Sequence, residues 1–139
     1  MATPPLFATG LPKRRALNTI FLTCASTDTT AAVRAWLPKG CYVTGMYVIG
    51  AAASGAVTSA VIGVGTTVAA NELVANYDVK TAATGKGFNA VGTTAVPANW
   101  TKTTADTPLY VKYTGVGGGD SGTWTIKVNY VFVGPGETL

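Results

Sequence analysis

The chain of 139 residues contains no histidine, and only 12% of its residues are charged, about half the usual ~25%. Without an imidazole to accept the proton of a nucleophile, neither a Ser-His-Asp nor a Cys-His catalytic group can form. The few acidic residues show no local spacing of metal ligands; they are Asp28, Glu72, Asp78, Asp106, Asp120 and Glu137. A carboxylate pair brought together by strands is the one catalytic alternative left open. We therefore expect no enzyme, no metal site and no cofactor.

Two glycine motifs are similar to known signatures but lack the context that those signatures need. GDSG at residues 119–122 matches the sequence around the serine of chymotrypsin-like proteases, whose chemistry requires a histidine. Gly117, Gly119 and Gly122 match the GxGxxG spacing of dinucleotide sites, in which a helix must follow. Here the sequence predicts a strand from Thr123, so we interpret both motifs as turns.

Cysteine is scarce, and no segment has the composition of a membrane helix. The apolar flanks of Cys24 and Cys41 favour two buried thiols over a disulfide. The N-terminal residues lack the order of a secretory signal, because their basic residues follow the short apolar stretch. Residues 41–71 carry no charge, but their glycines and β-branched residues make a poor helix. We therefore expect no membrane partner.

The chain is rich in period-two alternation of apolar and polar residues, which is typical of half-buried strands. In residues 108–133 a first run places Leu109, Val111 and Tyr113 on one face. A second run has its own apolar face, made of Trp124, Ile126, Val128, Tyr130 and Phe132. The glycines between the two runs predict an antiparallel hairpin, whose apolar face another sheet must cover.

Further strands are predicted over residues 16–23, 31–37, 41–49, 56–64 and 77–80, with a hairpin connection at 50–55. Residues 68–77 are the only segment with helical spacing, and they predict one or two turns at most. About eight short strands separated by turns predict an all-β fold, either an antiparallel two-sheet sandwich or a barrel. We expect one such domain over residues 16–139.

The N-terminal residues 1–15 are predicted to form an extended basic arm without a core face of its own. They contain three prolines and end in Lys13, Arg14 and Arg15, the only cluster of basic residues in the chain. Two interpretations stay open: a frayed, solvated terminus, or an arm that lies on another subunit and is held there by charge.

Candidate contact residues within the domain come from the three tryptophans. Trp124 lies on an apolar strand face and is predicted to be core, whereas Trp36 and Trp100 lie beside turns and are better placed for a contact surface. Outside the arm the basic residues are spread one at a time. The net charge of +4 therefore does not indicate a nucleic-acid partner.

Four strand-and-turn phrases, taken together, carry a resemblance to a known family. They are LPKG (37–40) before a strand, VIGVGTT (61–67), NELVANYDVK (71–80) with a following GKG (85–87), and TPLYVKYTG (107–115) continued by GGDSGTWTIKVNYV (118–131). With these phrases the chain resembles the cement or decoration proteins of tailed bacteriophage capsids, in particular the small jelly-roll type found on short-tailed phages. The resemblance covers most of the chain after Ala16 and leaves the arm uncovered.

The resemblance implies a jelly-roll sandwich, made in the host cytoplasm, that forms a homodimer or homotrimer and assembles onto the outer surface of the virion. Its partner there would be the phage major capsid protein, whose shell it would stabilise, and no catalytic residue or cofactor comes with the family. Two alternatives remain. The chain could be another virion protein, such as a fibre, tail or primary coat protein, or a carbohydrate-binding module that uses Trp36 or Trp100.

Overall fold

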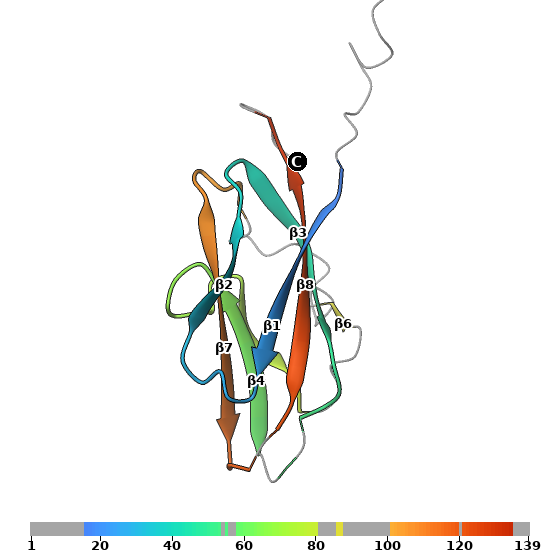
Figure 1. Cartoon of the computed structure of the whole chain (residues 1–139), viewed down its shortest axis with the longest axis vertical. Coiled ribbons are helices and arrows are strands. Elements are labelled where there is room, and N and C mark those ends of the chain that lie inside the picture. The colour runs from blue at the N-terminus through green and yellow to red at the C-terminus, as the bar shows by residue number, and fades with distance from the viewer. Residues whose placement is uncertain are drawn as a thin grey trace, which may run out of the picture.

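The computed structural model describes residues 16–53, 55, 58–80, 101–119 and 121–134, together with the backbone of residues 86 and 87. These residues form eight β-strands and no helix, arranged as two facing sheets (Figure 1). The strands are β1 (Asn18–Ala25), β2 (Ala32–Leu37), β3 (Cys41–Ile49), β4 (Ser59–Gly65), β5 (Val74–Asp78), β6 (Lys86–Gly87), β7 (Thr107–Val116) and β8 (Thr123–Phe132).

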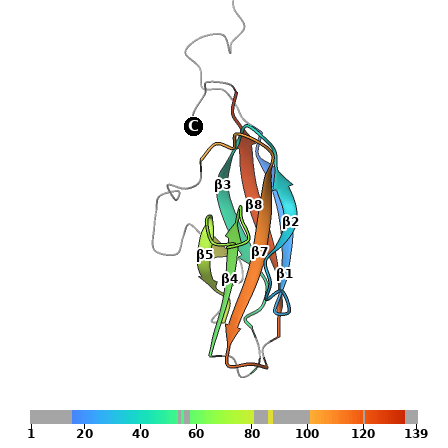
Figure 2. The ribbon, with the colours of Figure 1, turned by 90° about the vertical axis from the view of Figure 1, so that its left-hand side faces the viewer.

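Each sheet has four antiparallel strands, in the order β1-β8-β3-β6 and β2-β7-β4-β5. Figure 2 shows the second sheet facing the viewer, with β5, β4, β7 and β2 side by side. This strand order is that of an eight-stranded jelly roll. The predicted all-β sandwich is therefore confirmed. Among the described strands, each one from β1 to β7 except β4 is followed by a strand of the opposite sheet, and only β4 and β5 are consecutive neighbours.

The predicted hairpin in residues 108–133 is wrong, because β7 and β8 lie in different sheets. Gly117, Gly118 and Gly119 all have positive φ and carry the chain from one sheet to the other rather than back along the same sheet. The connection at residues 50–55 does the same between β3 and β4. Alternation identifies which side chains point inward, but it does not identify the neighbouring strand.

The two inner faces pack against each other, and β7 and β8 supply the centre of this core. Trp124 in β8 stacks on Tyr113 in β7, with ring centroids 5.5 Å apart, and its indole N–H donates a hydrogen bond to Ala51 O at 2.8 Å. The predicted inner faces of β7 and of β8 as far as Val128 are confirmed, but beyond Val128 the alternation shifts, so that Val131 and Val133 are buried and Phe132 is 48% exposed. The fully buried aliphatic side chains around them include Leu22, Leu37, Met46, Val48, Ile62, Val64, Leu109, Val111 and Ile126.

The predicted helical turns at residues 68–77 are wrong as well. The described chain forms a loop over residues 66–73 and then enters β5. The loop folds onto the outer face of β4, where Ala70 and Glu72 occupy the space that a Cβ at Gly63 or Gly65 would need.

One carboxylate holds this loop in place. Glu72 accepts hydrogen bonds from the backbone N–H groups of Thr66 at 3.0 Å, Thr67 at 3.4 Å and Asn71 at 3.3 Å, and from the Thr67 hydroxyl. These bonds satisfy three backbone donors of the loop. The short segment is therefore more stable as a loop bonded to Glu72 than as an isolated helical turn.

The core predicts a sharp contrast between two tryptophans. Replacing Trp124 with alanine should lower the free energy of unfolding by about 3–5 kcal/mol, because the indole fills the space between the sheets and its removal leaves a cavity. Urea denaturation measures this loss. The control is Trp36→Ala, which should change stability by less than about 0.5 kcal/mol because that side chain is 58% exposed. Equal losses in the two variants would contradict the assignment of Trp124 to the core.

Candidate functional site

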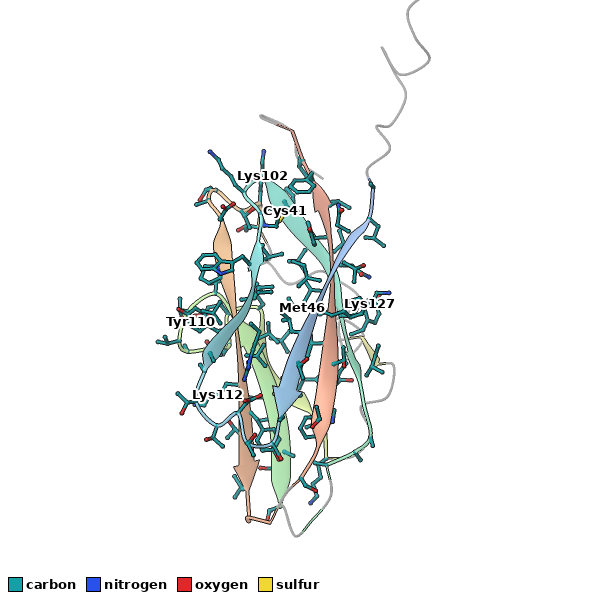
Figure 3. The ribbon with its side chains drawn as sticks, in the orientation of Figure 1. Cys41, Met46, Lys102, Tyr110, Lys112 and Lys127 are labelled. Carbon is teal, nitrogen blue, oxygen red and sulfur yellow. The ribbon has the colours of Figure 1, made fainter. Side chains whose placement is uncertain are left out.

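Three segments that are distant in the sequence meet at one end of the sandwich. The turn between β2 and β3 is bonded to residue 103, since Gly40 N–H donates to Thr103 O at 2.9 Å and Thr103 N–H donates to Cys41 O at 2.9 Å. The chain leaving β8 joins on the other side, where Val133 N–H donates to Gly40 O at 2.8 Å. We call this region the β2–β3 end; Figure 3 labels Lys102 and Cys41 there.

Side-chain hydrogen bonds make the turn at this end rigid. The Thr103 hydroxyl donates to Pro38 O at 2.7 Å and accepts from Cys41 N–H at 3.0 Å. On the other flank, Lys39 N–H donates to a carboxylate oxygen of Asp106 at 2.9 Å. Because these bonds anchor the backbone on both sides, the side chain of Lys39 projects from a fixed position.

The β2–β3 end carries an open cavity of about 640 Å³, with two lysines beside an apolar surface. The Lys102 ammonium donates to Gly134 O at 2.9 Å, which holds its side chain along the rim. Phe132 supplies exposed aromatic surface and packs edge-on against Tyr130, with ring centroids 5.8 Å apart. The cavity is lined by Lys39, Gly40, Lys102, Thr103, Thr104, Phe132 and Val133. Two cations next to apolar surface suit a partner segment that combines acidic and apolar groups.

Trp36 lies where the sequence placed it, on the surface beside this turn. It is 58% exposed near the end of β2, and its strand partner in β7 is Pro108. Only two residues separate it from Lys39 along the chain. A large exposed aromatic ring next to a rigid basic turn is the kind of residue that anchors protein–protein contacts.

The other predicted contact residues, Lys13, Arg14, Arg15 and Trp100, lie outside the described residues. The described chain begins at Ala16. β1 starts beside the last residues of β8, because Asn18 pairs with Tyr130. The arm is therefore joined to the domain near the β2–β3 end (Figure 1).

Sequence reasoning missed three residues of this end: Lys39, Lys102 and Phe132. Lys39 stands between the proline and glycine of LPKG, so its place in a turn was a usable signal. The position of Lys102 at this end was not predictable. It depends on the hydrogen bonds between Thr103 and Cys41, which lie 62 positions apart in the sequence. Phe132 was predicted on the inner face, but the alternation shifts near the end of β8, so that its neighbours Val131 and Val133 are buried and Phe132 is exposed.

The residues usually responsible for redox, metal and nucleophilic chemistry are not gathered in the described part of the chain. No group of three histidine, cysteine or acidic side chains close enough to hold a metal occurs among those residues. Cys24 and Cys41 are both free and buried rather than joined in a disulfide. Burial raises the pKa of Cys24 to about 12, and burial also raises the pKa of Cys41. Within the same described ranges, no helix has the length and apolarity to cross a bilayer.

Among known proteins, the chain is similar in fold to two solved structures. No protein-family model matches the chain, and no curated protein matches it. Among solved structures, it is similar to a chain of the cyanophage Pam1 capsid asymmetric unit, with a TM-score of 0.63 and 19% identity over 94% of both chains. It is also similar to a chain of the acid-stable capsid of Helicobacter pylori bacteriophage KHP30, with a TM-score of 0.52 and 9% identity over 86% of this chain and 94% of that one.

The buried thiols predict a measurable difference between the folded and the unfolded chain. The thiolate is the form that attacks iodoacetamide and displaces its iodide, so at about pH 8 neither Cys24 nor Cys41 should react at an appreciable rate in the folded protein. In urea at the same pH both should be labelled fully, as mass spectrometry would count. Rapid labelling of either residue without denaturant would contradict its burial, and a mass two units low in the unlabelled protein would reveal a disulfide.

Proposed function

We propose that this chain is a structural protein of a bacteriophage particle that binds across subunits of the major capsid protein and reinforces the shell. The observation that carries the proposal is the jelly-roll likeness, along almost the whole chain, to chains from two phage capsids. The phrase-by-phrase resemblance of the sequence to capsid decoration proteins supports the finer role. A chain without histidine and with little charge is consistent with a role in contacts rather than in chemistry.

Reinforcement follows from counting contacts over a whole shell. Each bound copy adds interface between neighbouring capsid subunits, and a protein that binds the assembled shell but not the free subunits stabilises the shell by mass action. Many weak contacts repeated over a lattice give a large total effect, because once one contact is made the next is effectively intramolecular. No single contact therefore has to be strong.

The β2–β3 end is the surface that we assign to the capsid. Lys39 and Lys102 supply positive charge on a rigid frame, and Trp36 and Phe132 supply exposed aromatic surface on either side of the turn. Aromatic residues that become buried typically contribute most of the affinity of such an interface, while the charges orient the approach. The complementary capsid surface would be acidic around an apolar centre.

The arm ending in Lys13, Arg14 and Arg15 would make a second contact from the same end. A short tether that starts beside the first contact keeps the three basic residues at high local concentration over the neighbouring capsid subunit. Their attraction to an acidic surface is electrostatic, so this part of the binding should weaken as salt is raised.

Charge reversal at the β2–β3 end tests the assignment. The double variant Lys39→Glu/Lys102→Glu should weaken attachment to preformed capsids that lack this chain by about tenfold or more, measured by co-sedimentation over a range of protein concentrations. The matched control is Lys80→Glu/Lys112→Glu, which changes the net charge by the same amount at positions away from this end and should attach like the original chain.

Other outcomes would contradict the proposal. Equal weakening of both double variants would indicate general charge attraction without a defined surface. Closed shells formed by this chain alone would indicate a primary coat protein. Glycan binding that Trp36→Ala abolishes without unfolding the domain would indicate a carbohydrate-binding module.

Deletion of residues 1–15 tests the arm by itself. The truncated chain should attach to capsids more weakly, while its melting temperature stays nearly unchanged because the domain core begins after the arm. Co-sedimentation and differential scanning calorimetry on the same preparation measure the two quantities. An unchanged attachment curve would show that the arm is a solvated terminus without a partner.

A further inference from the structure

The described strands leave four sheet edges, β1, β2, β5 and β6, and three of these strands carry features that discourage pairing with another chain. In the described part of the structure, β2 contains Arg34 and an irregular register, β5 is five residues long and ends in Asp78, and β6 has two residues, one of them Lys86. Charged side chains, irregular register and short length are the usual protections of an open sheet edge.

The fourth edge strand, β1, has none of these protections. Its sequence, NTIFLTCA, contains no charged residue, no proline and no glycine. All eight residues pair with β8 without a shift in register. Phe21 at its centre is 63% exposed. An edge this long, regular and apolar is a template for another strand, and β8 is its only sheet neighbour among the described strands.

The backbone direction along β1 shows which residues could pair outward. Just beyond the strand, Ser26 N–H donates to Gly122 O on the side of β8. The preceding N–H, of Ala25, points the other way and donates to the Asp28 carboxylate at 2.8 Å. Backbone groups alternate between the two sides of an antiparallel strand. The N–H and C=O groups of Thr19, Phe21 and Thr23 therefore face the open side.

The side chains of β1 identify the partner. Residues 19–23 read TIFLT, which is nearly the same in both directions. In an antiparallel pair centred on Phe21, Thr19 meets Thr23 of a second copy, Ile20 meets Leu22, and Phe21 meets itself. These are threonine, aliphatic and aromatic pairs, which all stabilise antiparallel sheets, and no like charges face each other.

We propose that β1 pairs antiparallel with β1 of a second copy of this chain, about a two-fold axis at Phe21. The three outward residues of each strand would exchange backbone hydrogen bonds with the other, and the two β1-β8-β3-β6 sheets would join into one. Such an interface is isologous, because each residue faces its symmetric counterpart. The dimer does not depend on the proposed capsid role. Where that role holds, the antiparallel pairing places the two β2–β3 ends at opposite ends of the dimer, so one dimer can bridge two capsid sites.

Charge substitution at residue 21 tests the symmetry directly. Sedimentation equilibrium of the full chain should give a dimer of about twice the 14.1 kDa monomer mass. Phe21→Lys and Phe21→Glu should each raise the dimer dissociation constant by about tenfold or more, because two like charges then face each other at the axis. An equimolar mixture of the two variants should form the dimer again, because only a two-fold contact places lysine opposite glutamate.

Two controls separate this edge pairing from other contacts. Ile49→Lys adds the same charge on β3, an interior strand of the same sheet, at a side chain that is 46% exposed, and it should leave the dimer intact. Far-ultraviolet circular dichroism and the melting temperature should show that every variant is folded. A monomeric or trimeric original chain, a Phe21→Lys variant that still forms dimers, or a mixture that stays monomeric would each overturn the proposal. Failure to bind capsids by a chain that does dimerise would contradict only the proposed function.

Discussion

The contact between the two sheets is the constraint on which the rest of the structure depends. Each sheet has one apolar face that is stable only when it is covered, and the stacked rings of Tyr113 and Trp124 lie where the two faces meet. With so few charged residues, the chain has few long-range electrostatic interactions available for its stability. Burial of apolar surface between the sheets, together with the ladder hydrogen bonds, therefore has to supply most of it.

This two-layer arrangement also decides where function can be located. Because almost every strand is followed by one in the opposite sheet, the connections cross at the two ends of the sandwich. Residues from positions near 40, 103 and 133 therefore meet at one end, although they are far apart in the chain. The outer faces, apart from the part of β4 that the loop over residues 66–73 covers, and the strand edges remain for contact with other chains. Ends and edges thus supply two separate kinds of contact surface.

The sequence predicted which side chains of a strand point inward better than it predicted which strands are neighbours. The inward-pointing residues of β7 and the first half of β8 follow directly from alternation, whereas Trp36 was selected for its place beside the LPKG turn and is exposed there. The assignment of β7 and β8 to different sheets could not be read from alternation, because a glycine-rich turn serves a hairpin and a crossing equally well. The loop over residues 66–73 was missed for a different reason: helical spacing of Leu73, Val74 and Tyr77 was visible, whereas the hydrogen bonds of Glu72 to the loop backbone are a tertiary feature.

The hydrogen bonds that Glu72 accepts from the loop affect the behaviour of the protein in acid. Burial alone would raise the pKa of this carboxyl, but the hydrogen bonds from Thr67 and the surrounding backbone favour the charged form more, and the pKa lies below its ordinary value. The pKa of Glu72 is lower in the folded protein than in the unfolded chain. Its hydrogen bonds therefore contribute their full stability above the pH at which an unfolded glutamate protonates, and this contribution is lost only as the pH falls further. The β4–β5 loop therefore keeps its shape through mild acidification, and only stronger acid releases it.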